Sequence, residues 1–288
     1  NNKSKMIWKK NYYNKSEKKT LPLLNLSSQE KILIVTDSLS KYYAVDLDNG
    51  KIIWEKNHNV TFISDIKIDD DRFYVIDANN VVYCFSIIDG SKIWEFSTEL
   101  ELVKSQKKLS IVYDNEKIYF NNSVGNLYSL DKKNGNLIWV TYTKDTDNFL
   151  QSFLLKTSKL IMDNDNLYFS NNQNAFFSVD KKSGFVNWKQ NINSEIKPVI
   201  VENLIFSISS EGLLFVLEKN LGNILRITNV FDQFKKRKRE KIKPTGIILD
   251  VDTIFITLNN GKIILANVID GKVHSKFSIS RSRISQPF

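Results

Sequence analysis

The densest run of charge in the chain is Lys235-Lys236-Arg237-Lys238-Arg239, which is followed by Lys241 and Lys243. Adjacent cations of this kind form either a solvated loop or a contact for an anionic lipid surface or nucleic acid. Binding of single-stranded nucleic acid also requires aromatic side chains interleaved with the cations, and the run has none. A solvated loop and an anionic partner surface therefore both stay open, with nucleic acid as the weaker alternative.

A second group that suggests chemistry is the acidic cluster Asp163-Asn164-Asp165-Asn166, whose oxygens are of the type that binds calcium. The same slot holds Asp69-Asp70-Asp71, Asp114-Asn115-Glu116 and Asp250-Val251-Asp252 elsewhere in the chain. Aspartate and asparagine favour turns because their side chains hydrogen-bond to the nearby backbone. We therefore interpret the cluster as a hairpin turn and predict no metal site.

Nucleophiles and general bases are scarce. The chain has two histidines, His58 and His274, and one cysteine, Cys84. It has no phosphate-binding glycine-rich loop, no nucleophile elbow and no zinc-binding histidine pair. A single cysteine excludes an internal disulfide and a cysteine-rich metal site. We predict a non-enzymatic protein with no catalytic residue and no cofactor.

Composition indicates one folded domain. Apolar residues make up 42% of the 288 residues, which is ordinary for a globular protein. No apolar run approaches the roughly 18 residues that span a bilayer. The net charge of +9 reflects lysines spread along the whole chain. We expect residues 1–288 to form a single domain that is a fragment of a slightly longer chain.

The elements that position these residues are repeated. The best copy runs from Ala44 to Trp54, and its core is a glycine followed four residues later by a tryptophan. The copies are Gly50 with Trp54, Gly90 with Trp94, Gly135 with Trp139 and Gly184 with Trp188, with worn forms at Gly222 with Arg226 and Gly271 with Ser275. A further copy opens the chain at Ser4 and Trp8. Successive copies lie 38 to 49 residues apart, the spacing of one four-stranded propeller blade per repeat.

Each repeat has the pattern of four short strands. In the second repeat these are 66–68, 73–76, 81–86 and 93–96, where alternation and β-branched residues favour strands. The turn before the fourth strand needs a residue with positive φ, which explains the glycine in that slot. We predict an all-β fold, a β-propeller of four-stranded antiparallel blades with six complete repeats and a split or truncated blade at the chain ends.

The repeated tryptophans are expected on the fourth strands, where each buries on the order of 200 Å² against a neighbouring blade. A residue that recurs once per blade is best explained by a contact that recurs once per blade. We therefore predict a structural docking motif made of Gly50, Trp54, Gly90, Trp94, Gly135, Trp139, Gly184 and Trp188. Cys84 holds the place of Ala44 and is expected to be a small buried residue that makes room for a tryptophan.

The phrase Ala44-x-Asp46-x-x-x-Gly50-Lys51-x-x-Trp54 resembles the docking motif of the pyrroloquinoline-quinone-type propeller repeat. The resemblance covers nearly the whole chain and implies the repeat class. It also leaves open a quinone-dependent oxidoreductase or a degenerate relative of one. The quinoprotein dehydrogenases are longer and use a calcium site and often an adjacent cysteine pair, and this chain has one cysteine and no recognisable acidic ligand set.

In size the chain is more similar to the BamB family. The stretch 261–272 resembles that family's penultimate blade, and 285–288 resembles the first strand of a final blade. With a lone fourth strand at Trp8, this gives seven blades, or eight if more chain belongs to the protein. The resemblance implies a lipid-anchored scaffold on the periplasmic face of the bacterial outer membrane, where it assists insertion of β-barrel proteins.

The BamB resemblance also implies partner-binding residues. That family contacts the central barrel-assembly subunit through two inter-blade loops, which correspond here to Leu100, Leu102 and Lys104 and to Asp145 and Asp147. The expected partners are barrel-assembly subunits and unfolded outer-membrane proteins. An anionic surface at Lys235, Lys236, Arg237, Lys238 and Arg239 is the further alternative.

Overall fold

The computed structural model of the chain describes residues 6–98, 107–143 and 155–280. In these ranges the protein consists of six four-stranded antiparallel sheets and two short helices. Each sheet is formed by one repeat, so the six complete repeats correspond to six blades of a β-propeller. The predicted all-β fold class is confirmed. No helix of the described ranges is long and apolar enough to cross a membrane.

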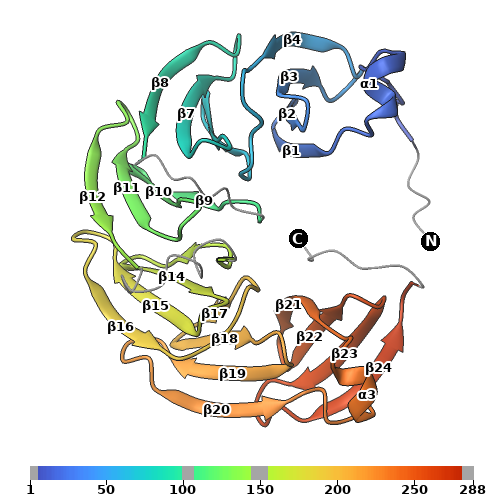
Figure 1. Cartoon of the computed structure of the whole chain (residues 1–288), viewed down its shortest axis with the longest axis vertical. Helices are drawn as coiled ribbons and strands as arrows, with labels where there is room; N and C mark the ends of the chain where they lie inside the picture. The colour runs from blue at the N-terminus through green and yellow to red at the C-terminus, as the bar shows by residue number, and fades with distance from the viewer. Residues whose placement is uncertain (1–5, 99–106, 144–154, 281–288) are drawn as a thin grey trace. The chain divides into compact units, whose positions relative to one another are not determined.

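The first of two compact units comprises residues 1–140 and 144–154. It holds helix α1 (Lys15–Lys19) and the strands β1 (Leu24–Gln29), β2 (Ile32–Asp37), β3 (Lys41–Asp46), β4 (Ile52–Asn57), β5 (Lys67–Asp69), β6 (Arg72–Ile76), β7 (Val81–Ser86), β8 (Lys92–Ser97), β9 (Ile111–Tyr113), β10 (Lys117–Asn121), β11 (Leu127–Asp131) and β12 (Leu137–Thr141). Strands pair in chain order within the sheets β1 to β4, β5 to β8 and β9 to β12. Successive sheets lie side by side, with the first strands on one side and the fourth strands on the other (Figure 1).

The second unit comprises residues 141–143 and 155–288. It holds the strands β13 (Ile161–Met162), β14 (Asn166–Asn171), β15 (Ala175–Asp180), β16 (Val186–Gln190), β17 (Val199–Val201), β18 (Leu204–Ile208), β19 (Leu213–Glu218), β20 (Ile224–Asn229), β21 (Pro244–Asp250), β22 (Thr253–Leu258), β23 (Lys262–Asn267) and β24 (Val273–Ser278), and helix α3 (Lys236–Arg239) between its last two sheets. Here too the strands pair in chain order, in the sheets β13 to β16, β17 to β20 and β21 to β24.

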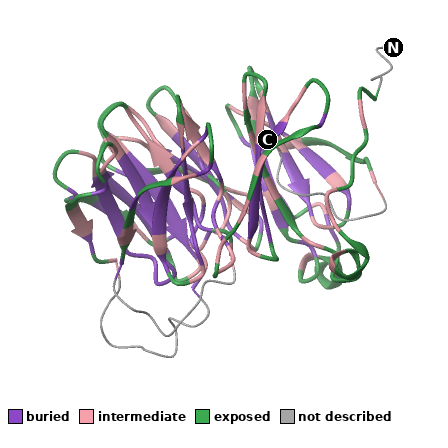
Figure 2. Ribbon diagram, turned by 90° about the horizontal axis from the view of Figure 1, so that it is seen from above, coloured by how far each residue is buried: buried purple, intermediate pink, exposed green. Residues whose placement is uncertain are grey.

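The core lies in the second and third strands of each sheet. Their burial is nearly continuous, whereas the fourth strands are mostly exposed, with a half-buried or buried residue at intervals. Figure 2 shows buried residues along the strands and exposed residues in the turns. This pattern arises because the two inner strands have sheets packed on both faces, so both sets of side chains must be apolar.

A β-bulge recurs between the third and fourth strands. The register shifts directly after the pair Ala44 and Trp54, and again after the pair Cys84 and Trp94. A bulge leaves one residue unpaired and increases the local twist. Cys84 is fully buried opposite Trp94, as the sequence predicts for a small residue that makes room for an indole.

The predicted fourth strand at Trp8 is wrong. Residues 6–14 form no strand, because a strand requires a hydrogen-bonded neighbour and no described residue pairs with this segment. The chain enters α1 instead. The Asn14 side chain caps this helix by accepting from the backbone of Ser16 and Glu17, and Glu17 pairs with Lys41 at 3.4 Å.

Candidate functional site

The repeated tryptophan contacts the glycine of the following sheet, not the glycine of its own turn. Trp54 Nε1 donates a hydrogen bond of 2.8 Å to the carbonyl oxygen of Ile87. A Cβ on Gly90 would lie 2.7 Å from Trp54 Cε3, closer than two carbon atoms approach. Gly90 also has φ +67°, so both its conformation and its lack of a side chain are required.

The same arrangement recurs along the chain. The Trp8 indole lies against Gly50 and donates to the carbonyl oxygen of Leu47. The Trp94 indole lies against Gly135 and donates to that of Lys132. The Trp188 indole lies against Gly222 and donates to that of Lys219. Trp139 lies on β12 beside Tyr119, with ring centroids 5.9 Å apart. Gly184 lies at the start of the fourth strand in the next repeat, and its carbonyl oxygen accepts from Thr141. For Trp8, Trp54, Trp94 and Trp188 the carbonyl that accepts from the indole is three residues before the glycine.

Arg226 takes the place of the tryptophan in the fifth sheet. Its Nη2 donates at 2.8 Å to the carbonyl oxygen of Val268, three residues before Gly271, and its Nη1 donates to that of Ile269. The residue opposite also changes, because Val216 faces Arg226 where Ala44 and Cys84 face tryptophans. The degenerate repeat with Gly222 and Arg226 therefore keeps the hydrogen bond to the next repeat, with a guanidinium in place of an indole as the donor.

Ion pairs that the sequence did not suggest reinforce two of these contacts. Lys132, whose carbonyl oxygen accepts from Trp94, also pairs with Asp69 at 2.7 Å. The carbonyl oxygen of Lys219 accepts from Trp188, and the Lys219 ammonium group pairs with Asp163 at 3.0 Å. Each lysine thus holds the preceding sheet twice, once through its backbone and once through its ammonium group. The signal in the sequence is a lysine three residues before the glycine.

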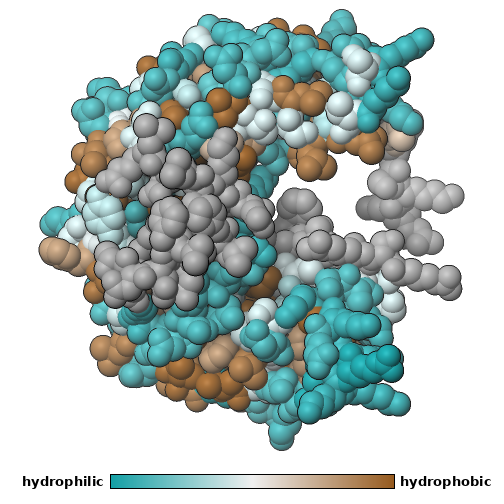
Figure 3. Space-filling view, in the orientation of Figure 1, coloured by the Kyte–Doolittle hydropathy of each residue, from teal (hydrophilic) through white to brown (hydrophobic). Residues whose placement is uncertain are grey.

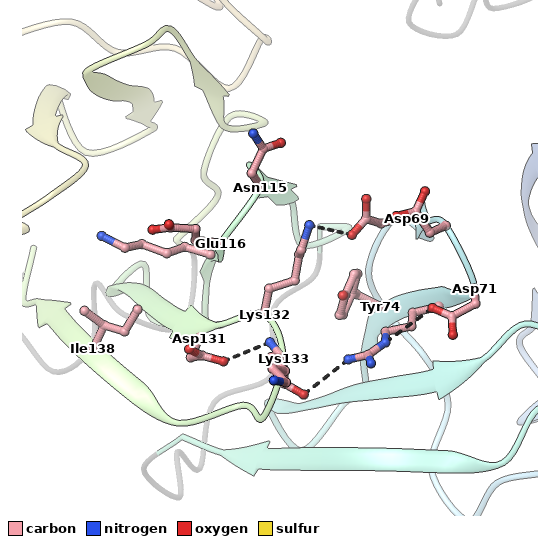
Figure 4. A pocket seen from close by; sticks show the side chains of 12 residues that line it. Asp69, Asp71, Tyr74, Asn115, Glu116, Asp131, Lys132, Lys133 and Ile138 are labelled. Atoms are coloured by element: carbon pink, nitrogen blue, oxygen red, sulfur yellow. Dashed lines mark hydrogen bonds and ion pairs between the residues drawn. The ribbon is translucent and has the colours of Figure 1, made fainter.

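A cavity of about 720 Å³ lies between the second and third sheets of the first unit (Figure 4). Its wall includes Tyr74, Lys132 with its partner Asp69, and Arg72, which pairs with Asp71 at 3.4 Å. The Tyr74 hydroxyl is buried without a hydrogen bond to a described nitrogen or oxygen. Burial raises the pKa of this hydroxyl, so the phenol stays neutral. The cavity therefore presents paired charges beside a buried neutral phenol.

The equivalent tyrosines of the next two sheets do have partners. Tyr119 donates to Asp114 at 2.9 Å and Tyr168 donates to Asp163 at 3.2 Å. In the second sheet the corresponding carboxylate, Asp69, instead faces Lys132. The Tyr74 hydroxyl interacts instead with the thiol of Cys84 on the neighbouring strand.

The fourth strands present open edges with exposed apolar side chains. In the described ranges each fourth strand has one hydrogen-bonded neighbour, the third strand. Exposed apolar residues on or beside these strands are Ile52, Ile53, Ile93, Leu137, Ile138, Phe185, Val186, Leu221, Ile224, Leu225 and Ile227. Figure 3 shows a hydrophobic patch over β20. Open edges of this kind can accept a further strand from another chain.

The basic run is only partly a solvated loop. Phe231, Phe234 and Ile242 are buried in the core of the last two sheets and anchor the segment that contains α3. Arg239 is engaged locally, with Nη1 at 2.8 Å from Asp232 Oδ1 and Nε donating to the carbonyl oxygen of Phe234. The remaining cations of the run are exposed. The segment is therefore an ordered basic surface.

The histidines and the cysteine have different surroundings. His58 Nε2 is 3.5 Å from Asp77, a buried carboxylate that also accepts from Tyr83. His274 is exposed on β24. Burial raises the pKa of the Cys84 thiol to about 12, so this group is a neutral core side chain. The two proposed partner loops, with Leu100, Leu102 and Lys104 and with Asp145 and Asp147, lie outside the described residues.

Comparison with known proteins identifies relatives of this fold. The sequence profile of the family described as outer membrane protein assembly factor BamB matches residues 2–228. The structure is similar to BamB from Moraxella catarrhalis, with TM-score 0.76, 15% identity and coverage of 91% of this chain and 77% of that one.

Other solved structures are similar at lower scores. The C-terminal WD40 domain of Sif2 matches with TM-score 0.66, 11% identity and coverage of 91% of this chain and 74% of that one. The computationally designed protein Ika8 matches with TM-score 0.60, 11% identity and coverage of 92% and 90%. No curated protein sequence matches the chain significantly.

Proposed function

Because the chain belongs to the family of the outer membrane protein assembly factor BamB, we propose that it is a non-enzymatic scaffold which assists the insertion of β-barrel proteins into the bacterial outer membrane. The observation that carries this proposal is the family match over residues 2–228. The likeness in structure supports the fold, which by itself is compatible with many functions. In this proposal the protein acts at the periplasmic face of the membrane and is lipid-anchored in its full-length form.

The open fourth strands suit clients that are themselves strands. A β-barrel precursor has unpaired backbone N–H and C=O groups, and an exposed edge offers it a temporary ladder of hydrogen bonds. On β20 the exposed side chains of Ile224, Leu225 and Ile227 accompany such an edge. We infer that these edges receive unfolded outer-membrane proteins, while the loops around Leu102 and Asp145 bind the barrel-assembly subunits.

The proposal is tested by purification of partners from gently solubilised membranes. Wild-type full-length protein is compared with D145K/D147K, and D250K/D252K serves as the matched control because it reverses two exposed turn carboxylates of the same spacing. We expect barrel-assembly subunits to copurify with wild type and with the control, and to be lost from D145K/D147K.

Two results would contradict the proposal. If no barrel-assembly subunit copurifies with wild type, the scaffold function is wrong. If a bound quinone chromophore copurifies instead, the alternative of a quinone-dependent oxidoreductase replaces it. Equal recovery of subunits with D145K/D147K would leave the scaffold but remove these two aspartates from its contact surface.

A further inference from the structure

A second cavity, beside α3, concentrates positive charge that the scaffold function does not use. It has a volume of about 460 Å³ and is lined by Lys235, Lys238, Lys241, Lys262 and Lys276, together with Phe234. Among its lining residues within the described ranges there is no carboxylate. Figure 3 shows the surface over α3 and β24 as hydrophilic.

The five lysines converge from three parts of the chain. Lys235, Lys238 and Lys241 belong to the segment around α3, Lys262 lies on β23 and Lys276 lies on β24. A cavity assembled from residues so far apart is produced by the fold. The charge of the sequence run alone therefore does not account for it.

Phe234 fixes two of these cations. Its ring is 7% exposed and packs in the core of the last two sheets. The ammonium groups of Lys262 and Lys276 lie 6.0 and 5.0 Å from the ring centroid, within the range of cation–π attraction. Since the ring is held by the core, these lysines have a rigid support at the cavity wall.

The cavity has no counter-charge of its own. None of the five lysines pairs with a described carboxylate. Asp232, the acid that precedes the run, is occupied by Arg239 at 2.8 Å. Like charges gathered without counter-charge repel one another, so an anion that binds among them removes an unfavourable interaction and gains several favourable ones.

We propose that this cavity binds a phosphorylated group that carries two or more negative charges. Lysine ammonium groups act as mobile point charges and are common phosphate ligands. The volume admits a phosphorylated sugar or a lipid headgroup. Nucleic acid fits less well, because the one aromatic ring in the wall, Phe234, is buried and cannot stack on a base.

The basic run divides into residues that serve this site and residues that do not. Lys235 and Lys238 line the cavity, whereas Lys236 and Arg237 are exposed and do not line it. Arg239 is engaged by Asp232. The pair Lys236 and Arg237 therefore provides a control for net charge within the same four-residue helix.

The test uses pyrophosphate as the probe and isothermal titration calorimetry at constant ionic strength. K262Q/K276Q removes two lining cations from the sheet, and K236Q/R237Q removes two that do not line the cavity. We expect K262Q/K276Q to weaken binding by about tenfold or more, and the control to weaken it by less than about twofold. K235Q/K238Q, on the other wall, should act like K262Q/K276Q, and circular dichroism confirms that each variant is folded.

Vesicles distinguish the source of the phosphate. Binding to vesicles that contain cardiolipin, whose headgroup carries two phosphates, but not to phosphatidylcholine vesicles, with the same dependence on Lys262 and Lys276 assigns the site to a lipid headgroup. Pyrophosphate binding without vesicle binding assigns it to a free phosphorylated molecule. The proposal is overturned if wild type does not bind pyrophosphate, if both variant pairs weaken binding equally, or if a single-stranded oligonucleotide binds while pyrophosphate does not compete.

Discussion

Arg226 Nη2 donates a 2.8 Å hydrogen bond to the carbonyl oxygen of Val268, the position that accepts from a tryptophan indole in other sheets. The contact between successive blades therefore depends on a donor at this position of the fourth strand and on a glycine beside the acceptor. Tryptophan supplies the donor with a large apolar ring, whereas arginine supplies it with two hydrogen bonds and a charge.

The first prediction concerns this substitution. Arg226→Ala should lower the free energy of unfolding by about 1–3 kcal/mol, because the carbonyl oxygens of Val268 and Ile269 lose a charged donor. Arg226→Trp should be accepted only together with Val216→Ala, since residues opposite tryptophans are small. Chemical denaturation of R226A, R226W and R226W/V216A measures the free energy of unfolding of each variant. Full stability of R226W without the second change would contradict it.

The second prediction concerns Gly90. Gly90→Ala should destabilise the wild-type protein by about 2–4 kcal/mol, from a strained positive φ and from overlap of the new methyl with Trp54. In a Trp54→Ala background only the strain remains, at about 1 kcal/mol. A double-mutant cycle measured by urea unfolding gives the coupling energy between Gly90→Ala and Trp54→Ala. A coupling energy near zero would mean that the indole does not require the glycine.

The third prediction concerns Cys84. The thiol is fully buried and burial raises its pKa to about 12, so a thiol reagent at pH 8 should label native protein only through unfolding. Labelling in denaturant should be complete within minutes.

The same thiol makes a signed contribution to stability. Its folded pKa lies above its ordinary value of 9.0, so its contribution is present below pH 9 and is lost as pH rises toward 12. Cys84→Ala should remove this dependence on alkaline pH. Rapid labelling of native protein would show that the strand pair β7 and β8 opens readily.

The fourth prediction concerns the ion pair of Asp163 and Lys219. Burial raises the pKa of Asp163, but hydrogen bonds from Lys219 and from the backbone of Asn166 and Asp165 outweigh it, and the net pKa is lowered. The pair therefore stabilises the protein above the ordinary carboxyl pKa of 3.8, and this stabilisation is lost as pH falls through the lower folded value.

Lys219→Met should destabilise the protein by about 1 kcal/mol at pH 7 and reduce the loss of stability on acidification. Lys31→Met is the matched control, because Lys31 and Asp48 form an ion pair of 2.9 Å with both side chains mostly exposed. Thermal unfolding at pH 7 and pH 3 compares the two variants. Equal losses of stability in Lys219→Met and Lys31→Met would show that partial burial does not strengthen the ion pair of Asp163 and Lys219.

Much of the fold followed from local pattern. The spacing of the copies from Gly50 to Gly271 predicts one four-stranded sheet per repeat, and the described residues form six such sheets. The strand at Trp8 was predicted wrongly because the indole contact and the strand ladder are separate requirements. Trp8 donates to Leu47 and lies against Gly50, yet no described strand pairs with its backbone.

The candidate sites were less predictable. Lys132 and Asp69, and likewise the lysines beside Phe234, come from separate segments of the chain, and no local pattern marks them as neighbours. The run at Lys235 is visible as charge, but its division into lining, exposed and engaged cations depends on where Phe231, Phe234 and Ile242 enter the core.

The sequence by itself determined the repeat, the strand order within each blade and the turn that requires a glycine, because these depend on periodicity and on backbone conformation close in the chain. Only the tertiary structure decided that Trp8, Trp54, Trp94 and Trp188 each contact the glycine of the next repeat, that Arg226 takes the place of a tryptophan, and that five lysines share one cavity. The physical reason is that contacts between residues 30 to 50 positions apart depend on how whole sheets pack, and packing is a property of surfaces that no single segment contains.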